Sequence, residues 1–325
     1  MTEKDHLIEH WPNGNKKREG FYRASSSSRT PNDKEGAWAS WYENGKDKAQ
    51  VSHDGFISCR NGPARSWYEN GQIETEIEFT NGHINGYVSI WYDDGQKALE
   101  GHYIGGEMTG EWKTWYQSGQ LRYQGFFYSL LSHDSYFHDD LHTWESVKED
   151  IWNWDDESSD EPIDDEQEES WHGQSPDFWW DDDFLEGGKE GVWTEWYENG
   201  QKKSETIYKN YDDYQTDVFQ HYLPSEKEGL ATEWYESSQK KSEGYYLENC
   251  KISEFLEWHE SGEIKSITHY LNWGDYPEPY DDNWNEEEAK DGKCIVFHEN
   301  GEIKLEEYYI KGKLYESNEY PLNEG

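Results

Sequence analysis

The sequence predicts an all-β protein: an open repeat array of antiparallel β-hairpins, a solenoid or elongated twisted sheet, with about 24 residues per repeat. Two observations lead to this prediction. A phrase made of an aromatic pair, one or two polar residues and a glycine recurs nine times, as in Trp41-Tyr42-Glu43-Asn44-Gly45. A second glycine, such as Gly36, stands five residues before the Trp of most repeats.

The spacing of the phrase gives the length of one repeat. A separation of 24 residues occurs three times between successive closing positions, so the longer gaps indicate the same repeat carrying an insertion. We expect these insertions in loops after Gly14, Gly119, Gly200 and Gly262. The closing positions are Gly14, Gly45, Gly71, Gly95, Gly119, Gly200, Ser238, Gly262 and Gly301.

Each phrase is expected to form the tip of a hairpin. Asn-Gly and Asp-Gly after an extended aromatic run are typical of a type I′ turn, which needs positive φ at both central residues. The structural positions of the repeats are Trp41, Tyr42, Gly45, Trp67, Tyr68, Gly71, Trp91, Tyr92, Gly95, Trp115, Tyr116, Gly119, Trp196, Tyr197, Gly200, Trp234, Tyr235, Trp258, Gly262, Phe297 and Gly301.

A second column of residues predicts the core. The position two residues after the first glycine is always apolar, and strand alternation puts it on the same face as the Tyr column and opposite the Trp column. A bulge at the glycine could instead bring the two Trp columns together, and both arrangements stay open. The apolar column reads Trp38, Ala64, Val88, Trp112, Trp193, Ala231, Phe255 and Cys294.

Repeats of the form G-x-W-x-x-W-Y-x-N-G-Q-x-K resemble the variant MORN repeats of bacteria. Tandem arrays of them are similar to the YwqK-type antitoxin or immunity-protein family, which implies a protein that neutralises a toxin by binding it. The family pattern defines structural residues and no catalytic ones. Three repeats depart from it: Trp11-Pro12-Asn13-Gly14 lacks the Tyr, Ser238 replaces the turn glycine and Phe297 replaces Trp.

Composition and charge limit the function further. The net charge of −42 disfavours direct binding of nucleic acid or of anionic membranes. The first residues, Met1 to His6, lack the basic and apolar regions of a signal peptide, so we expect a cytoplasmic protein. Three well-separated cysteines, Cys59, Cys250 and Cys294, favour isolated thiols over disulfides or a zinc site.

One insertion distinguishes this chain from a plain array. Residues 133–186 hold 21 acidic residues and one basic residue, Lys148. Apolar residues spaced at 3 and 4 from Phe137 to Trp154 predict a helix near 136–154, and the acidic run that follows predicts partial disorder. We therefore divide the chain into repeats 1–5 (1–126), an acidic Trp-rich insertion (127–187) and repeats 6–9 with two smaller acidic insertions (188–325).

Two interpretations of this insertion stay open. It could present charge and aromatic anchors to a basic partner, or it could be a solvated loop whose helix packs on the array. The predicted partner-binding residues are Trp144, Trp152, Trp154, Asp155, Asp156, Glu157, Trp171, Phe178, Trp179, Trp180, Asp181, Asp182 and Asp183.

No catalytic motif is present, so the sequence predicts a protein that is not an enzyme, without cofactor or metal. The histidines His133, His138 and His142 lack a standard metal-ligand spacing. The leading hypothesis is an antitoxin that covers the cationic groove of a nucleic-acid-acting toxin. The alternatives are a scaffold that joins proteins through its sheet face, and carbohydrate binding through aromatic ladders.

Overall fold

The computed structural model describes residues 4–23, 34–54, 59–128, 188–209, 225–272 and 290–322. Their regular structure consists of twenty β-strands, which confirms the all-β prediction. Within these ranges no helix is long and apolar enough to cross a membrane. The predicted helix at 136–154 and the acidic segment after it lie outside the described residues. The chain falls into two compact units, Met1–Gly119 with Phe127–Leu185 and Gln120–Phe126 with Glu186–Gly325.

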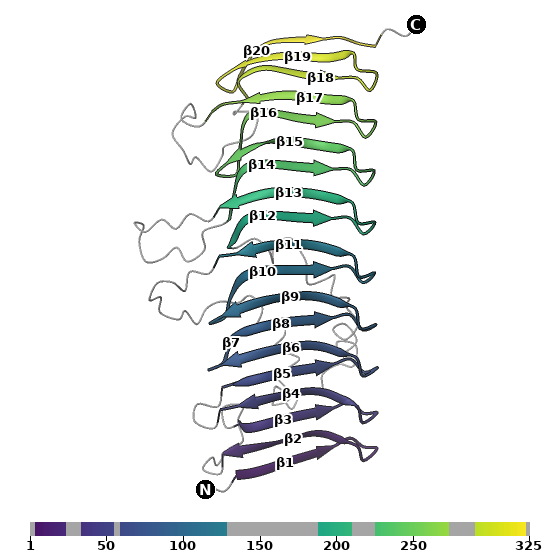
Figure 1. Ribbon diagram of the computed structural model, residues 1–325, viewed down its shortest axis with the longest axis vertical. Helices are drawn as coiled ribbons and strands as arrows, with labels where there is room; N and C mark the ends of the chain where they lie inside the picture. The colour runs from purple at the N-terminus through teal and green to yellow at the C-terminus, as the bar shows by residue number, and fades with distance from the viewer. Residues whose placement is uncertain are drawn as a thin grey trace, which may run out of the picture. The chain divides into compact units, whose positions relative to one another are not determined.

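In unit 1 the strands follow one another in chain order, each antiparallel to its neighbours (Figure 1). A two-residue strand, β7 (His83–Ile84), pairs with the end of β6. The others are β1 (Lys4–His10), β2 (Lys16–Arg23), β3 (Lys34–Trp41), β4 (Asp47–His53), β5 (Gly62–Trp67), β6 (Ile73–Thr80), β8 (Gly86–Trp91), β9 (Lys97–Ile104) and β10 (Glu107–Trp115).

Unit 2 repeats the same arrangement, coloured from teal to yellow in Figure 1. Its strands are β11 (Leu121–Phe127), β12 (Lys189–Trp196), β13 (Lys202–Lys209), β14 (Glu226–Trp234), β15 (Lys240–Leu247), β16 (Cys250–Trp258), β17 (Ile264–Tyr270), β18 (Gly292–Phe297), β19 (Ile303–Ile310) and β20 (Lys313–Glu319).

The hairpin tips correct one prediction. At the tip of β3–β4 the N–H of Gly45 donates to the carbonyl of Tyr42, and the N–H of Tyr42 donates to the carbonyl of Lys46. Gly45 has a φ of +84°, whereas Asn44 is not among the residues with positive φ. A type I′ turn is therefore wrong; the pattern is a turn closed by one left-handed glycine, with a bulge between Ser40 and Trp41.

Two consecutive left-handed residues occur instead at the opposite edge, where one repeat passes to the next. Asn81 and Gly82 have φ of +53° and +91° between the paired residues Thr80 and His83. The same two-residue link joins β9 to β10, β15 to β16 and β19 to β20. Type I′ geometry thus forms these four links and does not close the hairpin tips.

The two faces of the sheet follow the alternation that the sequence predicts. Glu195 stands two residues after Trp193 in the same strand, so its side chain lies on the face of the predicted core. Lys203 pairs with Glu195 and lies over the ring of Tyr197, so the Tyr column lies on that face too. Its neighbour Lys202 lies over the ring of Trp234, with its ammonium 2.6 Å from Glu205. The Trp column therefore lies on the other face, which we call the outer face, and the face with the core is the core face.

One line of side chains, the core ladder, crosses the strands of each unit on the core face. Its members lie opposite one another in the strand register, and its largest members, Trp38 and Trp112, are buried. In unit 1 it comprises Leu7, Gly20, Trp38, Val51, Ala64, Ile77, Val88, Gly101 and Trp112. In unit 2 it comprises Gly125, Trp193, Thr206, Ala231, Gly244, Phe255, Thr268, Cys294 and Glu307.

Neighbouring repeats fit together along this ladder by matching volumes. A Cβ atom on Gly101 would lie 2.2 Å from the Trp112 indole, and one on Gly244 would lie 2.0 Å from the Phe255 ring. Between β4 and β5 the sizes are exchanged. The ladder residue of the later repeat is small, Ala64, and the ladder residue of the preceding repeat is larger, Val51. The space for each large aromatic ring is therefore made by a missing side chain on the preceding repeat.

A second line of aromatic residues flanks the core ladder on the side of the inter-repeat links. Tyr22 meets Trp38 edge-on at a centroid distance of 4.9 Å, and Tyr103 meets Trp112 at 5.2 Å. In unit 2, Phe255 contacts Tyr246 at 5.9 Å and Tyr270 at 6.3 Å in the same geometry. Edge-to-face contacts of this kind are favourable beyond the area they bury.

The Tyr column joins each repeat to the next through hydrogen bonds. The hydroxyl of Tyr42 donates to the carbonyl of Trp67 at 2.7 Å, and that of Tyr68 donates to the carbonyl of Trp91 at 2.8 Å. Burial and nearby carboxylates raise the pKa of Tyr42 to about 12, so these hydroxyls remain donors at neutral pH. In the first repeat the indole N–H of Trp11 makes the same bond to Trp41.

The fit at Gly101 predicts a strong coupling with Trp112. Gly101→Val should destabilise the chain by about 1–3 kcal/mol or more through overpacking, and Trp112→Ala by about 3–5 kcal/mol through cavity formation. The double variant recreates the natural Val51–Ala64 pair and should be more stable than the sum of the single effects. Urea unfolding of the four proteins measures this, and additive effects would contradict the volume matching.

Ser238 adopts the left-handed conformation, with a φ of +71°, at a position where most repeats have glycine. Ser238→Gly should therefore raise the free energy of unfolding by roughly 0.5–1 kcal/mol, because glycine adopts this conformation without steric cost. The neighbouring Ser237→Gly, at a position without positive φ, is the control and should not stabilise. Thermal unfolding compares the two; equal shifts would show that the effect is not conformational.

His259 occupies the Tyr position of the eighth repeat, and its buried Nε2 has no hydrogen-bond partner among the described residues. We expect His259→Tyr to place a hydroxyl near the carbonyl of Phe297, as Tyr235 does with Trp258. The gain should be about 1 kcal/mol in urea unfolding. Tyr235→Phe serves as the reciprocal control and should lose a similar amount; a destabilised His259→Tyr protein would show that this repeat cannot accept the larger ring.

Candidate binding surface

Unit 2 exposes a line of apolar side chains on its outer face. We call it the apolar stripe; it consists of Phe126, Val192, Ile207, Leu230 and Tyr245, one from each of the strands β11 to β15. Phe126 and Val192 are each 50% exposed and Tyr245 is 52% exposed. These residues stand beside core-ladder positions in the sequence, so strand alternation turns them to the opposite face.

The register brings these five side chains together. Val192 lies opposite Ile207, and Leu230 lies opposite Tyr245. A Cβ atom on Gly229 would lie 3.1 Å from Cδ1 of Ile207, which shows how closely the Ile207 side chain approaches β14. At the other end, the indole N–H of Trp193 donates to the carbonyl of Phe126 at 3.0 Å. The stripe is therefore continuous across the five strands.

The stripe is comparable in area to the largest exposed apolar patch of a typical soluble domain. With half or a third of each side chain exposed, its apolar area is on the order of 400 Å². Exposed patches of this size on a soluble chain mark interaction surfaces more often than isolated apolar residues do. The sequence signal for the stripe is an apolar residue directly after the first glycine of the sixth and seventh repeats, Val192 and Leu230, which lies outside the shared repeat pattern.

The corresponding positions of unit 1 carry no such stripe. Ala37 lies opposite Ser52, and Pro63 opposite Glu78. Tyr87 is 79% exposed, but its ring contacts His102 edge-on at 4.9 Å instead of an apolar neighbour. The stripe is therefore a property of the sequence of unit 2 and is not imposed by the repeat fold.

Charged pairs border the stripe. On the side of the hairpin tips, Lys202 pairs with Glu205 at 2.6 Å and Lys240 with Glu243 at 2.5 Å. On the other side, Lys209 lies 3.3 Å from Glu228. Exposed pairs of this kind contribute little to stability, but they leave the border locally balanced in charge. The stripe is thus an uncharged surface within a strongly acidic chain.

Lysine ammonium groups cover several rings of the Trp column. They lie 5.3 to 5.6 Å from the ring centroids, within the range of a cation–π contact. Stacking of a sugar on these rings would have to displace the lysines, which weakens the carbohydrate hypothesis. The pairs are Lys16 with Trp41, Lys97 with Trp91, Lys202 with Trp234 and Lys240 with Trp258.

A small acidic group lies near the link between β15 and β16. Burial and the carboxylates of Glu248 and Glu228 raise the pKa of Glu226. Burial and the same acidic surroundings, Glu248 and Glu226, raise the pKa of the Cys250 thiol. A thiol with a raised pKa is a poor nucleophile at neutral pH, so this group does not form an activated catalytic cysteine.

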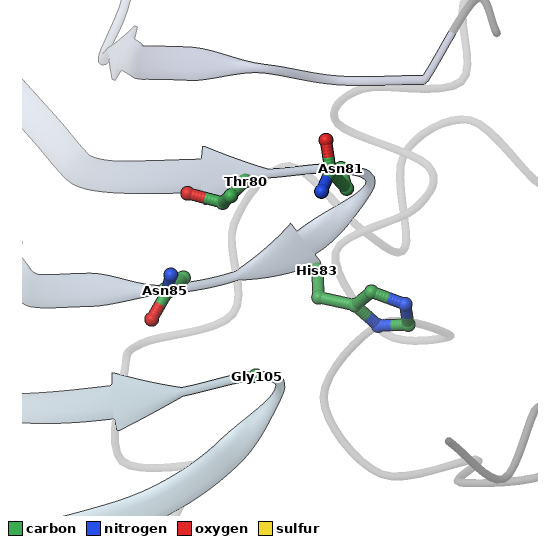
Figure 2. Close-up of a pocket in the computed structure, with 5 residues that line it drawn as sticks. All are labelled: Thr80, Asn81, His83, Asn85 and Gly105. Carbon is green, nitrogen blue, oxygen red and sulfur yellow. The ribbon is translucent and has the colours of Figure 1, made fainter. Parts of the chain in front are cut away.

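One pocket of about 230 Å³ lies in unit 1 at the links between repeats. Figure 2 shows its lining: Thr80, Asn81, His83 and Asn85 around the link after β6, and Gly105 from the link after β9. Of these five residues only His83 carries an ionisable side chain. The pocket supplies amide and hydroxyl groups but no acid–base pair, so it does not support catalysis.

The other predicted sites stand as follows. The repeat positions from Trp41 to Gly301 lie at or beside the hairpin tips that join successive strands. All thirteen predicted partner-binding residues, Trp144 to Asp183, lie outside the described residues. In the part of the chain that the structure describes, no cluster of three or more His, Cys, Asp or Glu side chains could hold a metal ion.

Comparison with solved structures gives matches of low identity. The TcdB2-TccC3-Cdc42 crystal structure shares 10% identity over 93% of this chain with a TM-score of 0.18. The TcdB2-TccC3 crystal structure gives the same values. The Tc holotoxin pore of Photorhabdus luminescens shares 11% identity over 94% of this chain with a TM-score of 0.19. This chain spans 15–16% of the length of those chains, and no curated protein matches it.

The family comparison agrees with the strand pattern. The model of the MORN repeat variant matches residues 60–81, 108–128, 189–210, 227–248, 253–272 and 290–311. Each of these segments contains strands of the described repeats. MORN repeats are in general non-catalytic modules that bind proteins or membranes. Six segments of the chain, each containing strands of the array, therefore match the MORN repeat variant.

Proposed function

We propose that this chain is a non-catalytic protein-binding array whose partner is a basic protein, and that it acts as an antitoxin or immunity protein. The observation that carries the proposal is the apolar stripe on a chain with a net charge of −42. The target would be a toxin that acts on nucleic acid. A bacterial, cytoplasmic setting similar to that of YwqK-type proteins belongs to the same proposal.

Charge and apolar contact contribute to such a complex in different ways. Enzymes that act on nucleic acid need a cationic groove, and a strongly acidic protein is attracted to such a groove and speeds its own association with it. Charge alone gives weak, salt-sensitive complexes, whereas buried apolar and aromatic anchors contribute most of the affinity. The stripe supplies such anchors, and the acidic chain supplies the attraction.

The acidic insertion remains the second proposed contact. Its 21 acidic residues between 133 and 186 carry about half of the net charge of the chain. Its aromatic residues, such as Trp171 and Trp179, would act as additional anchors. We propose that it reaches the cationic groove of the partner while the stripe holds a neighbouring surface.

A scaffold without a toxin partner is the second candidate function. The observation in its favour is the local charge balance around the stripe, where Lys202 and Lys240 neutralise Glu205 and Glu243. Binding through the stripe alone would depend little on salt. Salt dependence therefore separates the two functions.

The test is an affinity capture with the full chain and with a variant in which residues 133–186 are replaced by a short Gly/Ser linker, each washed at low and at high salt. We expect the full chain to capture a basic protein that salt releases, and the linker variant to capture less of it. The captured protein is then assayed for nuclease or deaminase activity with increasing amounts of this chain.

Inhibition at about one chain per captured protein would support the antitoxin function. Capture that is insensitive to salt and equal for both proteins, with no inhibition, would contradict it and favour the scaffold. The variant Tyr87→Ser, which removes an exposed aromatic ring outside both proposed contacts, is the matched control and should behave as the unmodified chain.

A further inference from the structure

The apolar surface of unit 2 extends beyond the stripe in the direction that crosses the strands. On β16 to β18 the apolar column lies two residues nearer the hairpin tips, at Leu256, Ile267 and Ile295. At this step Leu256 lies opposite Glu243, the same-face neighbour of Tyr245. Leu256 lies opposite Ile267, and Ile267 lies opposite Ile295. These three side chains are partly exposed. The stripe and these three residues together cross eight consecutive strands, from β11 to β18. We call this set of eight residues the apolar line.

The spacing of this line fits an α-helix. Neighbouring strands lie about 4.8 Å apart, so seven intervals span about 34 Å. One helical turn rises about 5.4 Å, so a helix that lies across the strands places about one turn over each strand. Over the whole line the difference between the two spacings adds up to about 4 Å, which is less than one turn. An extended strand presents side chains on one face about every 6.8 Å and would lose this match within a few strands.

Charge decides between the possible occupants. A second copy of this chain would also carry a net charge of −42, so electrostatic repulsion opposes the association of two copies through this face. The nearest carboxylates, on Glu205, Glu228 and Glu243, are each paired with a lysine of this chain. They therefore repel a neutral helix only weakly, and they do not attract an additional cation strongly. The negative field of the whole chain therefore favours a helix with basic side chains outside its apolar face.

We infer that the apolar line of unit 2 is the docking site for one basic amphipathic α-helix of the partner protein, lying across strands β11 to β18. This inference rests on the proposed protein-binding function and adds the form of the partner. The helix contributes about one apolar residue per turn, at spacings of three and four, over roughly 23 residues. Its lysines or arginines lie outside the apolar face, where the negative net charge of the whole chain attracts them.

A defined probe tests the inference without knowledge of the partner. The probe is a fluorescent peptide of about 24 residues with leucine on one helical face and lysine elsewhere. A peptide of the same composition in scrambled order and a peptide with glutamate in place of lysine are the matched probes. Fluorescence anisotropy with the full chain should show tightest binding to the amphipathic basic peptide.

The surface is tested with Val192→Ser, Ile207→Thr and Leu230→Ser in one variant. These side chains are exposed, so the fold should persist, which circular dichroism checks. Removal of their apolar contacts should weaken peptide binding by about tenfold or more. Tyr87→Ser should leave binding unchanged.

The inference would be overturned if the amphipathic and scrambled peptides bound equally tightly, or if the triple variant bound the amphipathic peptide as tightly as the unmodified chain does. Either result would show attraction through charge alone. Binding that occurs only after residues 133–186 are replaced by the linker would also overturn it, because the chain itself would then occupy the surface. The affinity capture described above is independent of the peptide assay. A captured toxin without peptide binding would reject the helical form while keeping the proposed function.

Discussion

The whole structure depends on the fit of one repeat against the next along the core ladder. Each strand layer is too thin to bury a side chain by itself, so a large ring such as Trp38 must find its space in the neighbouring repeat. Gly20 provides that space because a Cβ atom there would lie 2.2 Å from the Trp38 indole. Stability is therefore shared between neighbours, as in other repeat arrays, and no repeat needs an aliphatic core of its own.

The hairpin tips add a second connection that depends on the first. Once the core ladder sets the stagger between repeats, the hydroxyl of Tyr68 reaches the carbonyl of Trp91 and the amide of Asn70 reaches the carbonyl of Asp93. The same Asn70 accepts the N–H of Gln72 within its own turn. The Asn of the repeat phrase thus stabilises its own tip and the adjacent repeat at the same time, which explains its recurrence better than turn propensity alone.

Sequence reasoning predicted the features that repeat and failed where one local pattern fits two geometries. The period, the hairpins and the buried column from Trp38 to Cys294 follow from regular spacing, because a repeated constraint leaves a repeated signal. The tip geometry did not follow, since Asn44-Gly45 suits both a type I′ turn and a turn with a single left-handed glycine. The apolar stripe was missed because Val192 and Leu230 lie outside the shared repeat pattern, and the acidic insertion lies outside the described residues.

The two units show how much freedom this fold leaves to function. On the core face beside the core ladder, unit 1 buries Ser66 against Thr75, whereas unit 2 places Glu195 beside Lys203. On the outer face unit 1 pairs Ala37 with Ser52 and Pro63 with Glu78, where unit 2 has its continuous apolar stripe. The core ladder and the tips recur in both units, whereas the columns beside them differ in polarity between unit 1 and unit 2. An apolar outer column that the fold does not require needs another cause, and contact with a partner supplies one.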